Sequence, residues 1–165
     1  MSTLAKLILT VFAVAASSVM TKVQAADSIV GTWRLVSWIE EETESKAVHK
    51  NFGDNPLGVL TYTSDGRMMT IFADPSRKPP AAPKPTNAEA AQLYVTMVAY
   101  AGRYTLEGEK ITHHIDISWN QAWNGTDQWR YIELKNDRLA LKTPPFVSPF
   151  LNKEIVASVI WERAK

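Results

Sequence analysis

The run Gly31-Thr32-Trp33-Arg34-Leu35 decides the fold of this chain, because it opens a segment, 31–39, in which the side chains alternate. The residues expected on one face are Trp33, Leu35 and Ser37, and those on the other are Arg34, Val36 and Trp38. A period of two is the pattern of a β-strand, whose successive side chains point to opposite faces of a sheet. We therefore expect the folded part of the chain to begin with a strand at Gly31.

Seven further segments have the composition and spacing of short strands, with turn residues between them. They are 58–63, 67–72, 103–106, 110–118, 126–134, 138–143 and 154–163. Ser64-Asp65-Gly66 is a hairpin signal, because Asp and Gly tolerate the positive φ that tight turns require. Eight short strands in sequential order predict a mainly β chain folded as an eight-stranded up-and-down barrel, which has no sheet edges; a β-sandwich is the alternative.

The segment between 74 and 102 breaks the strand pattern. Five of the nine prolines lie within 75–85, and proline cannot donate to a sheet ladder. Thr86 and Glu89 then have the spacing of a capping box. The apolar residues that follow at helical spacing are Ala90, Leu93, Tyr94, Met97 and Ala101. We expect one inserted helix that ends at Gly102 and lies, with the proline-rich connection, over the mouth of the barrel.

The first 25 residues have the features of a cleavable export signal. Lys6 supplies a positive charge, 7–19 is almost continuously apolar, and Val23-Gln24-Ala25 fits the small-x-small cleavage pattern. The apolar run is shorter than the roughly 20 residues of a membrane-spanning helix, and an uncleaved anchor is the alternative. The sequence predicts a signal peptide at 1–25 and a single barrel domain at 26–165, located in the periplasm or secreted, with no stable membrane anchor.

Composition excludes several classes of partner and chemistry. Lys and Arg number 18 against 17 Asp and Glu, with no polybasic cluster, so neither nucleic acid nor an anionic membrane surface is an expected partner. The absence of cysteine rules out thiolate catalysis and thiolate metal sites. The three histidines lack metal-binding spacing, so we expect no metal and no other cofactor. The sequence leaves the oligomeric state open.

Two neighbouring predicted strands place polar side chains on inward faces. His113 shares the apolar face of 110–118 with Ile111, Ile115 and Ile117, which places His114 in solvent. Arg130 shares a face with Ile132 and Leu134 on the next strand, as does Gln128. His113 could be an ordinary core residue and Arg130 could lie at the lip of the barrel.

The more specific hypothesis is that His113 and Arg130 lie together inside the barrel and contact a ligand. A buried guanidinium is costly unless it is paired, and few acids fall on inward faces. A ligand carboxylate, enolate or carbonyl is then the expected partner of Arg130, and His113 beside it is expected to be neutral at pH 7. Tyr62 and Tyr104 fall on apolar faces and are expected to add phenol groups to the cavity wall, together with Gln128.

Several stretches resemble the bacterial lipocalin-like domain family, a branch of the calycin group. The matching stretches are 31–38, 58–68, 100–104, 112–114 and 161–163. The resemblance implies a lipocalin-like barrel built around a cavity. In lipocalins a basic residue near the end of the last strand covers the first-strand tryptophan, which implies that Arg163 stacks on Trp33 at the closed end, a cation–π contact of roughly 0.5–2 kcal/mol.

Two functions from different classes follow. The first is an exported protein that binds a small, mostly apolar molecule, with an acidic or carbonyl group, in its cavity. The alternative is a cofactor-free isomerase or cyclase, in which His113 or a tyrosine is the general acid or base and Arg130 stabilises an enolate. The export signal favours the binding protein, because small-molecule biosynthesis is usually cytoplasmic.

Overall fold

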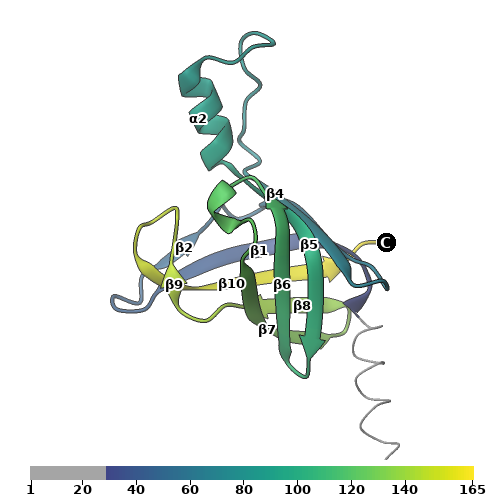
Figure 1. Cartoon of the computed structure of the whole chain (residues 1–165). Coiled ribbons are helices and arrows are strands. Elements are labelled where there is room, and N and C mark those ends of the chain that lie inside the picture. The colour runs from purple at the N-terminus through teal and green to yellow at the C-terminus, as the bar shows by residue number, and fades with distance from the viewer. Residues whose placement is uncertain (1–28) are drawn as a thin grey trace, which may run out of the picture.

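A computed structural model describes residues 29–165, which form an antiparallel β-barrel with one projecting arm (Figure 1). The predicted signal peptide at 1–25 and its cleavage site lie outside the described residues. Within 29–165, no helix has both the length and the apolar character needed to cross a membrane.

Eight long strands form the wall of the barrel. They are β1 (Gly31–Glu42), β3 (Leu57–Tyr62), β4 (Arg67–Ala73), β5 (Met97–Glu107), β6 (Lys110–Ser118), β7 (Asp127–Lys135), β8 (Arg138–Lys142) and β10 (Glu154–Arg163). Each pairs with the next along the chain, and β10 pairs with β1 to close the sheet. Two short strands, β2 (Val48–Lys50) and β9 (Phe146–Val147), extend the sheet beside β1 and β10. The predicted mainly β, eight-stranded up-and-down barrel is confirmed, and the sandwich is excluded.

The interior face changes partway along β1. Trp33 and Leu35 are buried, as expected from alternation, but the pairing with β10 shifts after Leu35 so that Val36 is an extra residue. A β-bulge of this kind reverses the alternation beyond it. Trp38 therefore faces the interior and not the outside as predicted, and Glu40 follows it inward.

A second irregularity lies between β5 and β6. Ala101 pairs with Ile117 while Gly102 pairs with Ile115, so Asp116 has no partner in the ladder. Ile117 was predicted to face the interior and is instead 64% exposed. The bulge at Asp116 is the physical reason, because it turns the end of β6 over after His113 and Ile115 have pointed inward.

Helix α2 (Asn87–Val95) begins where the sequence predicted and ends early. Thr86 caps it, and the reciprocal hydrogen bonds of a capping box with Glu89 are present. The predicted continuation to Ala101 is wrong, because Met97 begins β5 and pairs with Ala73 of β4. Backbone pairing with a neighbouring strand has overridden a helical apolar pattern.

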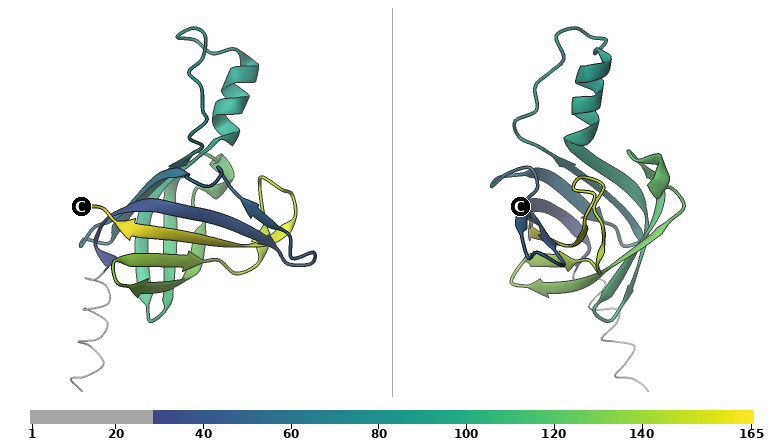
Figure 2. Two further views of the ribbon diagram at one scale, coloured as in Figure 1. Left: turned by 180° about the vertical axis from the view of Figure 1, so that it is seen from behind. Right: turned by 90° about the vertical axis from the view of Figure 1, so that its left-hand side faces the viewer.

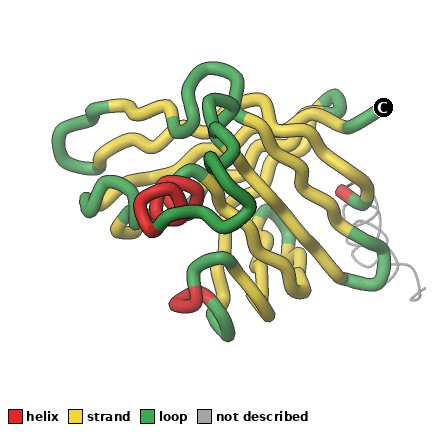
Figure 3. Tube along the Cα trace, turned by 90° about the horizontal axis from the view of Figure 1, so that it is seen from above, coloured by secondary structure: helices red, strands yellow, loops and turns green. Residues whose placement is uncertain are grey.

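The arm made by the proline-rich segment and α2 extends away from the barrel. Figures 1 and 2 show it standing off the sheet in every view, and no residue of α2 is buried. The prediction that this helix covers the barrel mouth is therefore wrong. In Figure 3 the rest of the described chain is almost entirely strand and loop, apart from the short 3-10 helix η1 (Gln121–Trp123).

Candidate functional site

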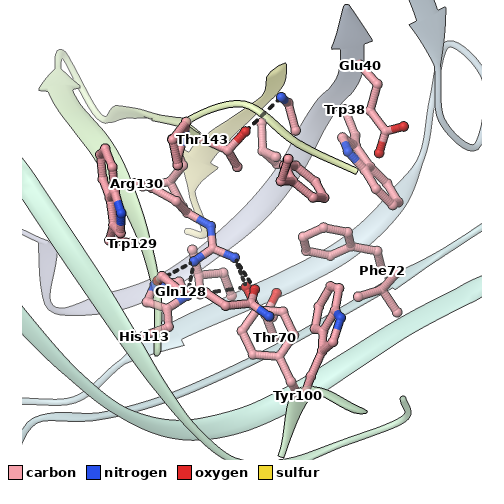
Figure 4. A pocket seen from close by; sticks show the side chains of 18 of the residues that line it. Trp38, Glu40, Thr70, Phe72, Tyr100, His113, Gln128, Trp129, Arg130 and Thr143 are labelled. Atoms are coloured by element: carbon pink, nitrogen blue, oxygen red, sulfur yellow. Dashed lines mark hydrogen bonds between the residues drawn. The ribbon is translucent and has the colours of Figure 1, made fainter. Parts of the chain in front are cut away.

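One part of the barrel interior encloses a cavity of about 380 Å³ (Figure 4). Most of its lining is aromatic or aliphatic, and a few polar side chains are gathered on it. The aromatic residues are Trp38, Phe72, Tyr100, Trp123, Trp129, Phe146 and Trp161, and the polar ones include Glu40, Thr70, His113, Gln128, Arg130 and Thr143. An apolar pocket with a few convergent polar groups is the usual composition of a small-molecule site.

The loop that follows β8, and not the helical arm, contributes to the wall near the opening. Pro144 and Pro149 of this loop line the cavity, as does Trp123 of η1. The loop is held to β10 where the Thr143 N–H donates to the Ala157 carbonyl at 2.9 Å. A proline-bearing loop therefore lines the cavity, and no residue of α2 does.

Arg130 lies on β7 with only 8% of its surface exposed, and four hydrogen bonds fix its guanidinium. Nη1 donates to His113 Nδ1 at 3.1 Å and to the Gln128 carbonyl at 2.9 Å. Nη2 donates to the Tyr100 hydroxyl at 3.1 Å and to Gln128 Oε1 at 3.2 Å. All of these acceptors are neutral, and Arg130 forms no ion pair within residues 29–165. Arg130 is thus a buried, hydrogen-bonded cation that has no carboxylate partner among the described residues.

His113 is fully buried on β6, and its neighbours fix the position of its proton. The guanidinium of Arg130 can only donate, so His113 Nδ1 accepts and the proton resides on Nε2. Nε2–H then donates to the Tyr62 hydroxyl at 2.7 Å. Burial lowers the pKa of His113 well below its usual value, and the positive charges of Arg130 and His114 lower it further. His113 is therefore a neutral imidazole at pH 7.

Tyr100 contacts both the guanidinium of Arg130 and the imidazole of His113. Its hydroxyl accepts from Arg130 and lies 3.2 Å from His113 Nδ1. Burial raises the pKa of Tyr100, so the phenol keeps its proton. The Nδ1 atom has one lone pair, for which Arg130 and Tyr100 compete. When Arg130 donates to it, the Tyr100 proton is available to an oxygen in the cavity.

A further donor on the cavity wall has no acceptor. Trp161 of β10 is 1% exposed and lines the cavity, and its indole N–H makes no hydrogen bond with any residue that the structure describes. Leaving a buried donor unpaired costs about 1–3 kcal/mol. Arg130 and Tyr100 present hydrogen-bond donors to the cavity, whereas the Trp161 N–H itself is buried.

The structure brings three of the five predicted ligand-binding residues to the cavity, namely His113, Gln128 and Arg130. Tyr62 is not on the wall but behind it, where burial raises its pKa well above the usual value and its hydroxyl holds His113. Tyr104 lies still farther from the cavity. Its hydroxyl donates to the Thr63 carbonyl at 3.0 Å and its ring packs on Tyr62 with centroids 4.8 Å apart.

Three cavity residues were not predicted from the sequence, namely Tyr100, Trp38 and Glu40. Tyr100 fell within the segment assigned to a helix, although the alternation of Val98, Tyr100 and Gly102 was a signal of the strand. Trp38 and Glu40 face inward because of the bulge at Val36, which no local pattern in the sequence marks.

The opposite end of the barrel is closed by Trp33. Arg163 lies over its ring at 4.3 Å from the centroid, and the indole N–H donates to the Ile29 carbonyl at 2.9 Å. Arg163 also donates to Asp137 at 2.8 Å and to the Val30 carbonyl at 3.1 Å. This is the stacked arrangement that the resemblance implied, and neither residue lines the cavity.

Residues 29–165 contain no group of three or more His, Cys, Asp or Glu side chains that could hold a metal ion.

Comparison with known proteins relates the chain to one family. The model of the lipocalin-like domain family matches residues 30–164. A crystal structure of a lipocalin-like protein from Bacteroides uniformis is similar over 82% of this chain and 98% of its own, at 12% identity and a TM-score of 0.42. A crystal structure of an uncharacterized protein from Bacteroides eggerthii covers 82% of this chain and 99% of its own, at 13% identity and a TM-score of 0.43. No curated protein matches significantly.

Proposed function

The chain belongs to the lipocalin-like domain family, and from this premise we propose that it binds a small, mostly apolar molecule that carries a carboxylate, enolate or carbonyl oxygen. Eight-stranded barrels have an interior that side chains fill or that holds one small ligand. Here an aromatic cavity of about 380 Å³ supplies the space for such a ligand.

The observation that carries the proposal is the buried cation on the cavity wall. Arg130 makes four hydrogen bonds to neutral acceptors and no ion pair with a described residue. A buried charge without a counter-charge is costly, and a ligand anion would offset that cost through charge-assisted hydrogen bonds. The proton of Tyr100 is a further donor for a ligand oxygen atom.

Binding is better supported than isomerase or cyclase chemistry. A general acid or base must exchange a proton with the substrate. Both ring nitrogens of His113 are instead within hydrogen-bond distance of protein groups, Tyr62 on one side and Arg130 with Tyr100 on the other. The imidazole therefore positions Arg130 and Tyr100 toward the ligand.

Replacing Arg130 tests the proposal. In Arg130→Met, affinity for 3-phenylpropanoate is expected to fall about 10–100-fold, the value of a hydrogen bond to a charged group, while affinity for 3-phenylpropanol changes less than about threefold. Isothermal titration calorimetry measures both ligands. The variant is expected to fold, because Tyr100 can donate to His113 Nδ1 once the guanidinium is gone. Arg103→Met, on an exposed position of β5, is the matched control and should bind both ligands as the wild type does.

Equal losses for the acid and the alcohol would contradict the assignment of Arg130 as the anion-binding residue. If 3-phenylpropanoate does not bind to the wild-type protein, the proposed class of cavity ligand is wrong.

Export is the second part of this proposal. It is supported by Lys6, the apolar run 7–19 and Val23-Gln24-Ala25. The intact mass of protein released from the periplasm should correspond to a chain that begins at Ala26. Ala25→Arg should block cleavage, because the signal peptidase site requires a small residue there. Wild-type protein that keeps residues 1–25 in the membrane fraction would show that the segment is an uncleaved anchor.

A further inference from the structure

Glu40 is a second buried charged side chain on the cavity wall. It lies on β1 with 1% of its surface exposed and lines the same cavity as Arg130. Oε2 accepts from the Ser148 hydroxyl at 2.8 Å. The Asn51 side chain is close enough to the carboxylate to favour its ionised form through a hydrogen bond. Each carboxylate oxygen can accept more than one hydrogen bond, so the group has acceptor capacity left over.

The sheet register places Glu40 and Arg130 on one row of residues across four neighbouring strands. Tyr131 pairs with Lys142, so the next position brings Arg130 opposite Thr143. Thr143 donates to Ala157, and Ala157 pairs with Glu40. The two charges are thus three strands apart on one row, about 14 Å along the curved sheet from the usual strand spacing. They are too far apart to form an ion pair with each other.

The surface beside the two charges is mostly apolar, and Thr143 and Ala157 lie between them on the row. Ala157 is a small residue on the row itself, and Figure 4 shows Glu40 beside Trp38, away from Arg130. Phe72 lies on the same wall, 5.2 Å from Trp38 between ring centroids. A flat apolar ligand could pack against these aromatic side chains, with Arg130 near one of its ends and Glu40 near the other.

The Ser148 hydrogen bond accounts for the orientation of Glu40 but not for its charge. Ser148 Oγ accepts from the Phe150 and Leu151 amides, so its proton is directed to Glu40. One hydroxyl contributes little against the cost of burying a carboxylate, which explains why burial raises the pKa of Glu40. A glutamine would satisfy Ser148 equally well without that cost.

We infer that the ligand has two polar ends: an acceptor oxygen bound by Arg130 and Tyr100, and a hydroxyl or ammonium donor bound by Glu40. The class that this geometry selects is a small aromatic acid with a donor on the side of the ring opposite the acid. The inference rests on the proposed function for the acid end and adds the recognition of the other end. Glu40 is then the residue that determines specificity among acids.

Matched ligands separate the two ends. Calorimetry is carried out with 3-phenylpropanoate and its 4-hydroxy and 4-methoxy derivatives, and with the corresponding phenylacetates, which are one methylene shorter. For the wild-type protein the 4-hydroxy acid of at least one length is expected to bind about tenfold more tightly than its unsubstituted and methoxy partners, the effect of one hydrogen bond to a charged acceptor. The methoxy compound is the informative partner, because it retains the oxygen and lacks the proton.

Glu40→Gln is expected to reduce the preference for hydroxy over methoxy to less than about threefold, because Ser148 will hold the amide oxygen and turn the NH₂ donor toward the cavity. Glu41→Gln changes an exposed carboxylate on the next residue of β1 and should leave the preference intact. A thermal unfolding curve shows whether each variant is folded. If Glu40→Gln does not fold, the wild-type ligand series alone decides.

The outcomes distinguish the two proposals. Acids that bind through Arg130 with equal affinity for hydroxy and methoxy derivatives would overturn the role of Glu40 and leave the proposed function standing. A preference that persists in Glu40→Gln would overturn it as well. If no acid of either length binds, the anionic ligand itself is wrong and the inference fails with it.

Discussion

Gly102→Ala is expected to remove at least about 3 kcal/mol from the free energy of unfolding, because β5 and β6 approach too closely there for any side chain. A Cβ atom at Gly102 would lie 1.9 Å from the His114 carbonyl oxygen and 2.9 Å from the Asp116 amide nitrogen. Both are backbone atoms, so no rotation of a neighbouring side chain relieves the overlap. The two strands must separate at the bulge, and urea unfolding followed by tryptophan fluorescence measures the loss.

Gly108→Ala is the control for Gly102→Ala. Gly108 has a φ of +61° and nothing within 4 Å of the added Cβ, so its expected cost is the conformational penalty alone, about 1–2 kcal/mol. Gly102→Ala should also weaken ligand binding if the protein remains folded, because His113 and Ile115 lie on the strand that has to move. If the free energy of unfolding of Gly102→Ala is within about 1 kcal/mol of the wild-type value, the two strands can separate at the bulge at little cost and the prediction is wrong.

The strands could be predicted from sequence because their signals are local. Alternation over 31–39 and 154–163, the Asp65-Gly66 turn and the Thr86–Glu89 capping box each need only neighbouring residues to be recognised. The two bulges could not be predicted in this way, because an extra residue in one strand is defined by the residues of its partner. Every wrong assignment of a face, at Trp38 and at Ile117, lies just beyond a bulge.

The candidate site was predictable to the same extent. His113 precedes the bulge on β6, and Arg130 lies on β7 in a regular ladder with that part of β6, so alternation placed both on the correct face. Tyr62 and Tyr104 are also on inward-facing positions, but alternation does not fix depth along the barrel axis. Both lie toward the closed end, beyond the cavity wall. Glu40 was missed for another reason, because the predicted strand ended at residue 39 and the bulge at Val36 turns the continuing strand over so that Glu40 faces inward.

Bulges therefore determine what the cavity can recognise. Without the shift at Val36, Glu40 would point to solvent and the cavity would lack its buried carboxylate. Without the shift at Asp116, the exposed Ile117 would turn inward at the end of β6. The bulge at Val36 thus adds a carboxylate to the cavity wall, and the bulge at Asp116 keeps an apolar side chain out of the interior, in keeping with the common use of β-bulges to re-aim side chains.

Trp33→Ala is expected to lower the free energy of unfolding by about 3–5 kcal/mol, through the cavity that the indole leaves and the loss of its contacts. Trp33 has no exposed surface and donates to the Ile29 carbonyl, so water cannot replace what is removed. Arg163→Ala should cost less, about 0.5–2 kcal/mol for the cation–π contact together with its bond to Asp137. Asp137→Asn removes the negative charge that pairs with Arg163 and keeps the stacking on Trp33, so it measures the contribution of the ion pair alone.

The double variant of Trp33 and Arg163 gives the decisive measurement. Because Arg163 lies 4.3 Å from the Trp33 ring centroid, the two losses should fail to add by about 0.5 kcal/mol or more in urea unfolding. Additive losses would show that the cation does not stabilise the indole in solution. Binding of 3-phenylpropanoate by folded Trp33→Ala protein should match the wild type at low temperature, since Trp33 does not line the cavity. A barrel closed at one end by Trp33 and Arg163 is then free to vary its ligand at the other, because stability and recognition reside in separate sets of side chains.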